Sequence, residues 1–180
     1  VYKIAQLLFP GQRRLAVLAA GIFGFAPDLI VVNGLLLTEP LFLCLFLSAV
    51  YKTLRVFRVS ESDTEHNTSD IFFMGILWTL TILTRPVALL PFLAVLLTFA
   101  RQRRFLAAGI IFLPALILIG PWSYYMSARH DSFILSTTAG GLDLWVGNNP
   151  DATGGFVKTP EIQQIRNTHH SVEFSRIAWQ

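Results

Sequence analysis

The chain has 180 residues, of which 53% are apolar and 14% are charged, and its formal net charge is +3. A soluble domain usually carries about 25% charged residues, so the composition argues against a soluble protein and predicts an integral membrane protein. The basic residues lie between apolar runs instead of forming one patch, which argues against a nucleic-acid partner and makes the lipid bilayer the expected surroundings. The one cysteine, Cys44, cannot form an intramolecular disulfide.

Successive apolar runs predict an all-α polytopic membrane fold with about five transmembrane helices. The runs cover residues 15–32, 38–57, 71–84, 87–100 and 105–122. A spanning helix needs about 17–25 residues, so the third and fourth runs are short. Residues 1–122 form the predicted transmembrane region, which begins with the tail of an earlier helix or an interfacial turn. Residues 123–180 form a predicted extracytoplasmic segment with a Gly/Asn-rich loop.

Basic clusters between the apolar runs predict the topology. They are Arg13 and Arg14; Lys52, Arg55 and Arg58; and Arg101, Arg103 and Arg104. The positive-inside rule places all of them in the cytoplasm. The second and third clusters share a side only if residues 71–100 form a hairpin with Arg85-Pro86 at its tip, because proline ends or kinks a helix. On this topology Glu39, Arg85 and everything after Trp122 lie outside.

Glu39 and Arg85 are the candidate functional residues of the helical region. Glu39 stands between Thr38 and Pro40, an order typical of a helix N-terminus. A carboxylate at the membrane edge is either functional or an acidic first turn that complements the helix dipole. Arg85 interrupts an apolar run with a guanidinium that either binds a phosphate or carboxylate or reaches lipid headgroups.

The stretch GLDLWVGNNPDATGGF, residues 141–156, contrasts with the apolar runs before it. Asparagine, proline, aspartate and paired glycines are typical of tight turns. Trp145 offers a plane for stacking, and Asn148, Asn149 and Asp151 offer hydrogen-bond donors and acceptors. This set suits carbohydrate hydroxyls, and it suits equally well a rigid loop that caps helices.

Other ionisable residues are weaker candidates. We interpret Asp28, after Pro27, as a structural turn residue. His169 and His170 are interpreted as a surface pair, because adjacent histidines point in different directions and no third ligand has suitable spacing. No Ser-His-Asp order, phosphate-cradling loop or paired-cysteine motif stands out. The sequence leaves open whether a divalent metal is needed.

The motifs occur in an order that resembles a known family. They are TEPLF at 38–42, LTRPV at 83–87, PW at 121–122, where a helix is expected to end, and GGLDLWVGNNPDATGG at 140–155. In this order the chain, from about Val1 to Phe156, is similar to the bacterial relatives of the dolichyl-phosphate-mannose–protein mannosyltransferases. These are polytopic glycosyltransferases of the C superfamily, which also includes the aminoarabinose transferases.

The resemblance implies an inverting membrane glycosyltransferase of the bacterial inner membrane. Its donor would be a polyprenyl-phosphate-linked sugar, and its acceptor a glycan, lipid or protein on the outer face. Arg85 would bind the donor phosphate, Glu39 would orient acceptor or sugar, and the loop residues Trp145, Asn148, Asn149 and Asp151 would contact sugar or acceptor.

One feature of the family has no counterpart in this sequence. The principal catalytic aspartate of the family lies in its first outer loop, and no residue here matches that aspartate. We therefore expect a fragment of a longer enzyme that is inactive by itself. The alternatives are a transporter or flippase of lipid-linked sugars, whose helices are also short and broken, and a truncated remnant without catalysis.

Overall fold

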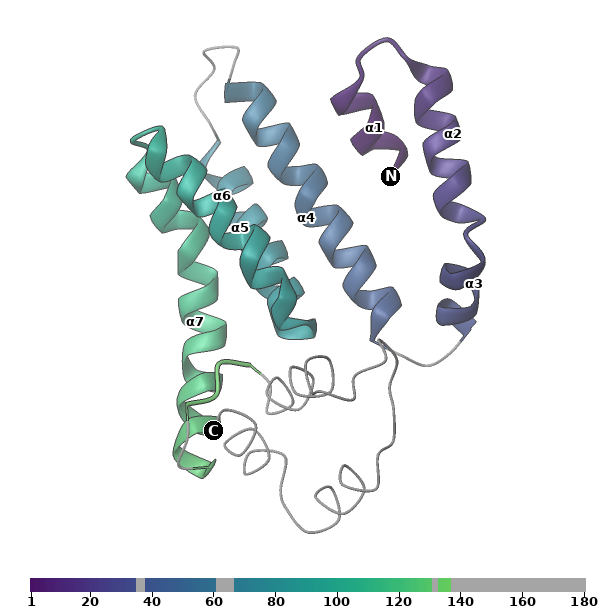
Figure 1. Cartoon of the computed structure of the whole chain (residues 1–180). Coiled ribbons are helices and arrows are strands. Elements are labelled where there is room, and N and C mark those ends of the chain that lie inside the picture. Colours follow the sequence, from purple (N-terminus) through teal and green to yellow (C-terminus); the bar gives the residue numbers. More distant parts are fainter. Residues whose placement is uncertain (35–37, 61–66, 131–132, 137–180) are drawn as a thin grey trace, which may run out of the picture. The chain divides into compact units, whose positions relative to one another are not determined.

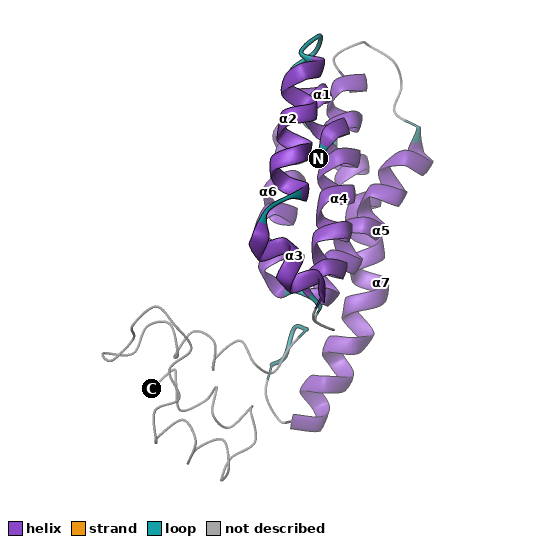
Figure 2. Ribbon diagram, turned by 90° about the vertical axis from the view of Figure 1, so that its right-hand side faces the viewer, coloured by secondary structure: helices purple, strands orange, loops and turns teal. Residues whose placement is uncertain are grey.

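The computed structural model describes residues 1–34, 38–60, 67–130 and 133–136. Within these residues every regular element is a helix, as Figure 1 and Figure 2 show. The chain divides into two compact units, Val1–Gly120 and Pro121–Gln180. Each unit is described by itself below. The all-α class that the composition predicts is confirmed for the described residues.

The first apolar run does not form one helix, and the prediction of a single span over residues 15–32 is wrong. The short α1 (Tyr2–Leu8) precedes α2 (Arg13–Gly24), and the separate α3 (Pro27–Gly34) follows. Pro27 has no N–H to continue the hydrogen-bond ladder of α2, and its fixed φ suits the first position of a new helix. At 1.5 Å per residue, the 12 residues of α2 extend about 18 Å.

The long α4 (Glu39–Ser60) packs against α5 (Thr68–Thr84) along most of its length. An ion pair joins Lys52 of α4 to Asp70 in the first turn of α5. Further along, the indole Nε1 of Trp78 donates a hydrogen bond to the Thr53 hydroxyl at 3.0 Å. Earlier residues of α4 meet later residues of α5, since Phe46 meets Trp78 and Glu39 meets Arg85, whereas Lys52 meets Asp70. The contacts thus run in opposite orders along the two helices, so α4 and α5 are antiparallel.

The chain turns back after α5, which confirms the predicted hairpin. A 3-10 turn, η1 (Pro86–Ala88), leads directly into α6 (Leu89–Arg101). Phe92, near the start of α6, lies against Trp78 with ring centroids 6.4 Å apart. Phe99, near its end, stacks on Phe57 of α4 at 5.0 Å. The basic residues that follow α6 therefore lie at the same end as those of α4, as the positive-inside argument predicts.

The last helix, α7 (Phe105–His130), approaches α5 very closely at Gly75. A Cβ on Gly75 would lie 2.5 Å from the backbone oxygen of Ile111, so no larger residue fits there without movement of the α7 backbone. Ile111 is fully buried. Buried side chains of α5, α6 and α7 form the centre of the first unit: Met74, Trp78, Ile82, Phe92, Phe99 and Ile111.

The helix α7 also corrects the expected helix end at Pro121-Trp122. It continues without interruption to His130. In the second unit, residues 133–136 return along its last turns. The Ser123 hydroxyl donates to the carbonyl of Ile134 at 2.6 Å, and the Ile134 N–H donates to the Ser127 hydroxyl at 3.0 Å. These hydroxyls supply partners to returning backbone, so the polar residues after Trp122 extend the helix instead of ending it.

Among the residues that the structure describes, two helices are long and apolar enough to cross a membrane. They are residues 39–58 of α4, with mean hydropathy 1.5, and α7, with mean hydropathy 2.2. Only 17% and 28% of the residues in their most apolar stretches are buried within the chain, so most residues of these stretches are at least partly exposed. The helices α5 and α6 are apolar but shorter. The count of five spans is therefore not confirmed by helix length.

Candidate functional site

The structure brings Glu39 and Arg85 into direct contact, although 46 positions separate them in the sequence. The guanidinium Nη2 of Arg85 donates to Oε1 of Glu39, and the two groups form an ion pair. Glu39 is the first residue of α4, and Arg85 is the residue that ends α5. The antiparallel packing of the two helices places these positions at the same end. Sequence reasoning predicted a shared face but not this contact.

Local sequence explains why each side chain stands where it does. Arg85 precedes Pro86, and a residue before proline is driven out of the helical region. Its backbone is accordingly extended, with φ −148° and ψ 122°. At Glu39 the chain enters α4, and the N–H of Phe42 donates to the carbonyl of Thr38 at 2.9 Å. Both residues therefore project from helix ends rather than from helix sides.

An aromatic row supports the ion pair. Arg85 lies over the ring of Phe42, with its Cζ 5.8 Å from the ring centroid, a distance at which a cation–π attraction operates. Phe42 stacks on Phe46 at 5.6 Å, and Phe46 meets Trp78 edge-on at 5.9 Å. The charged pair is thus connected through ring contacts to the buried tryptophan of the core. This continuous packing fixes the position of the guanidinium.

Phe42 is a site residue that sequence reasoning missed. It stands three positions after Glu39, and residues at this spacing lie on the same face of a helix. Its ring then reaches the cation that pairs with Glu39. The spacing Glu-x-x-Phe at the start of the helix could have identified Phe42 as a site residue, but only if the position of Arg85 next to Glu39 had been known.

The second oxygen of Glu39 has no hydrogen-bond partner among the described residues. This atom, Oε2, is buried, whereas the whole side chain is 30% exposed. A buried polar atom without a partner costs about 1–3 kcal/mol, and more for a charged group. The Arg85 side chain is 41% exposed, and its fork carries more donors than the one bond uses. The pair therefore offers an acceptor to a hydroxyl and donors to an anion, side by side.

Threonine side chains close the end of α5 next to this pair. Thr84 donates its hydroxyl proton to the carbonyl of Thr81 at 2.7 Å, and Thr81 donates to that of Leu77 at 2.6 Å. Both hydroxyls are therefore occupied by backbone carbonyls of their own helix. We assign them to the helix terminus and not to ligand binding.

The remaining sequence candidates are Asp28 and residues of the C-terminal segment. Asp28 is exposed in the first turn of α3, where a carboxylate complements the helix dipole. Trp145, Asn148, Asn149, Asp151, His169 and His170 lie outside the described residues. Among the residues that the structure does describe, no group of three or more His, Cys, Asp or Glu side chains could hold a metal ion.

The arrangement is that of a charged site at one end of packed, apolar helices. Comparison of the chain with protein-family models, with curated proteins and with solved structures finds no match. The functional argument therefore depends on the residues of this chain.

Proposed function

We propose that the chain is part of a membrane glycosyltransferase that transfers a sugar from a polyprenyl-phosphate carrier to an acceptor on the outer face of the bacterial inner membrane. The observation that supports this best is the Glu39–Arg85 pair, whose second carboxylate oxygen has no partner among the residues that the structure describes. The reaction needs a group that binds phosphate and a group that orients the sugar acceptor. The Arg85 cation meets the first need, and the Glu39 carboxylate, which can accept a hydrogen bond from a hydroxyl, meets the second.

The position of the pair supports an outward-facing site. The C-terminal ends of α4 and α6, which carry basic clusters, lie together (Figure 1). Glu39 and Arg85 lie together at the other end of the packed pair α4 and α5. The positive-inside rule assigns the basic end to the cytoplasm. The carrier would then present its phosphate at the outer interface, near Arg85, while its prenyl chain stays among the exposed apolar helix surfaces.

Each residue has a distinct part in the proposed transfer. The acceptor hydroxyl oxygen forms the new bond to the anomeric carbon, and the bond from that carbon to the carrier phosphate breaks. Arg85 stabilises the charge that grows on the leaving phosphate. Glu39 holds the acceptor or sugar hydroxyl through Oε2 while Oε1 stays with the guanidinium. Neither residue is assigned as the principal base, which the resemblance places on an aspartate that no position here matches.

The glycine-rich loop belongs to the same proposal. Trp145 would stack on a sugar ring, and Asn148, Asn149 and Asp151 would bond to its hydroxyls or to the acceptor. We expect Asn149→Ala with Asp151→Ala to lower transfer by about tenfold or more in the full chain, without loss of expression. Unchanged turnover would leave the loop with a structural role only.

The breaks after α2 and α5 favour one alternative, a transporter or flippase of lipid-linked sugars. Both candidates would bind the same lipid, so binding cannot separate them. The deciding experiment supplies the full-length protein in liposomes with a polyprenyl-phosphate carrier that bears a radiolabelled sugar. Label that becomes covalently attached to an acceptor supports the transferase. Label that only crosses the bilayer on its carrier supports the transporter. If the label is neither transferred nor moved across the bilayer, the result supports a non-catalytic remnant.

A further inference from the structure

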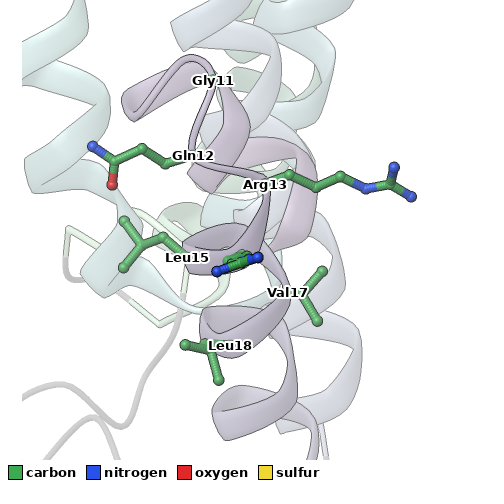
Figure 3. A pocket seen from close by; sticks show the side chains of 7 residues that line it. Gly11, Gln12, Arg13, Leu15, Val17 and Leu18 are labelled. Atoms are coloured by element: carbon green, nitrogen blue, oxygen red, sulfur yellow. The ribbon is translucent and has the colours of Figure 1, made fainter.

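A charged cluster separate from the Glu39–Arg85 pair lies at the turn between α1 and α2, where Arg13 and Arg14 follow each other. A hollow of about 860 Å³ opens there, lined by Arg13, Arg14 and the first aliphatic side chains of α2. Figure 3 shows Gln12 and Arg13 pointing to different sides of the turn, with Leu15, Val17 and Leu18 following along the helix. The hollow thus combines cationic groups with an aliphatic wall.

Arg13 and Arg14 have no acidic residue close to them in the sequence. Residues 1–27 contain Lys3, Arg13 and Arg14 but no Asp or Glu. Both arginines are exposed, and neither forms an ion pair within the part of the chain that the structure describes. Their position in the first turn of α2 opposes the helix dipole, so the charges do not stabilise the helix itself. An external anion would satisfy them.

An exposed apolar stripe continues from this end down α2. Its members are spaced three or four residues apart, which places them on one face of the helix, and they are Leu15, Leu18, Ile22 and Phe25, exposed by 39%, 62%, 75% and 82%. The ten residue steps from Leu15 to Phe25 cover about 15 Å. This length is half of a hydrocarbon core of about 30 Å, the depth of a single leaflet.

The opposite side of α2 is occupied. Ala16 is only 1% exposed, and α1 packs against α2. The ammonium of Lys3 lies over the ring of Tyr51, 5.9 Å from its centroid, and is therefore engaged with α4. The hollow and the stripe consequently form one surface, with two guanidinium groups that are exposed and have no ion pair among the described residues at one end, and hydrocarbon along one leaflet depth.

From this surface we infer an anionic-phospholipid site, in which Arg13 and Arg14 bind the phosphodiester headgroup and the stripe carries one acyl chain. Charge complementarity selects an anionic lipid over a zwitterionic one, because the hollow offers cations and no carboxylate. Basic groups next to a membrane helix attract anionic lipids of the cytoplasmic leaflet. The site is independent of sugar transfer and lies on the face that the topology assigns to the cytoplasm.

Native mass spectrometry of the full chain in mild detergent tests this inference, with phosphatidylglycerol and phosphatidylcholine added stepwise. We expect phosphatidylglycerol to bind in preference, and Arg13→Gln with Arg14→Gln to weaken its binding by roughly 10- to 30-fold. The matched control removes two charges elsewhere, by Arg101→Gln with Arg103→Asn, and should change binding less than about threefold. Asparagine suits position 103, whose φ is +56°.

A second variant keeps both charges and fills the hollow. Val17, 55% exposed on its wall, is replaced by Trp, and phosphatidylglycerol binding should fall while the thermal midpoint is unchanged. An equal loss in the control double variant would reduce the site to unspecific surface charge. Equal binding of the two lipids, or undiminished binding by both site variants, would overturn the inference and leave the surface to a protein helix or a second copy of the chain.

Discussion

The packed pair α4 and α5 carries two ion pairs that differ in their surroundings. At one end, Lys52 pairs with Asp70, whose side chain is 46% exposed and open to water. At the other end, Arg85 pairs with Glu39, which keeps one buried oxygen without a partner among the described residues. The first pair satisfies its charges and closes the helix hairpin. The second leaves one carboxylate oxygen without a partner in the described part of the chain, beside a guanidinium with more donors than its one hydrogen bond to Glu39 uses.

The flanking residues reinforce this difference. Near Lys52, the side chain of Asn67 accepts from the N–H of Ser69 at 3.1 Å and caps α5. Arg85 instead ends its helix in an extended conformation over the ring of Phe42. At the Lys52–Asp70 end, α5 begins with an ordinary side-chain N-cap. At the Glu39–Arg85 end, α5 terminates at a residue that presents a cation. The predictions below test whether function follows this division.

The largest effect is expected from Arg85→Ala. Loss of a cation that stabilises a leaving group typically costs about 10²–10³-fold in rate, and we expect a loss of kcat/KM in this range for sugar transfer by the full chain. The matched variant Lys52→Ala, at the other end of the same helix pair, should stay within about twofold, because it removes an ion pair and a cation–π contact with Phe73 that lie away from Arg85. Similar losses in both variants would mean that both pairs act through structure.

The next effect is expected from Glu39→Gln, which keeps the shape of the side chain but removes its charge. A hydrogen bond to a charged group contributes about 1.5–3 kcal/mol, so we expect a loss of roughly 10- to 100-fold in kcat/KM. Steady-state kinetics with varied acceptor measures it, and Asp28→Asn serves as the control. If Glu39 only complements the helix dipole, both variants will lower the thermal midpoint slightly and leave turnover intact.

Gly75→Ala tests the packing between the two ends. The added methyl would lie 2.5 Å from the Ile111 backbone oxygen, and overpacking of this kind costs about 1–3 kcal/mol. This exceeds the gain of about 0.5–1 kcal/mol from alanine in a helix, so the thermal midpoint in detergent should fall. Gly109→Ala, with nothing within 4 Å of the new Cβ, should leave it unchanged or raise it. Equal midpoints for the two variants would contradict the close approach of α5 and α7.

The smallest effect concerns Asp70, which lies just before the apolar part of α5. The hydrogen bond from Lys52 is the main cause that lowers the pKa of this carboxyl, with added attraction from Lys52 and Arg55 against the opposing effect of burial. A lowered folded-state pKa stabilises the fold above the unfolded value of about 3.9, and the contribution disappears as the pH falls through the folded pKa.

Asp70→Asn should therefore flatten the decline in thermal midpoint below about pH 4. Because the Asp70 side chain is 46% exposed, we expect its ion pair to contribute no more than about 0.2–1 kcal/mol after solvent screening, and less at high salt. Thermal unfolding at several pH values, with and without added salt, measures it. A pH profile identical to that of the unchanged chain would show that the ion pair contributes nothing.

Particular residues show how far sequence reasoning reached. The hairpin around Arg85-Pro86 was predicted correctly, because proline breaks helices locally and the basic clusters needed a common side. The single helix over residues 15–32 was wrong, because its apolar character hid the break that Pro27 introduces. The helix end at Trp122 was wrong, because α7 continues to His130, and Ser123 and Ser127 bond to the backbone of Ile134 from within the helix.

The sequence by itself determined the all-α class, the apolar character of the helices and the candidate residues Glu39 and Arg85, because composition, periodicity and proline act locally. Only the tertiary structure decided that these residues touch, that Phe42 lies beneath the guanidinium and that Glu39 Oε2 is left without a partner in the described part of the chain. These depend on the antiparallel packing and rotation of α4 against α5, which place residues 46 positions apart at one helix end. No local pattern specifies that arrangement.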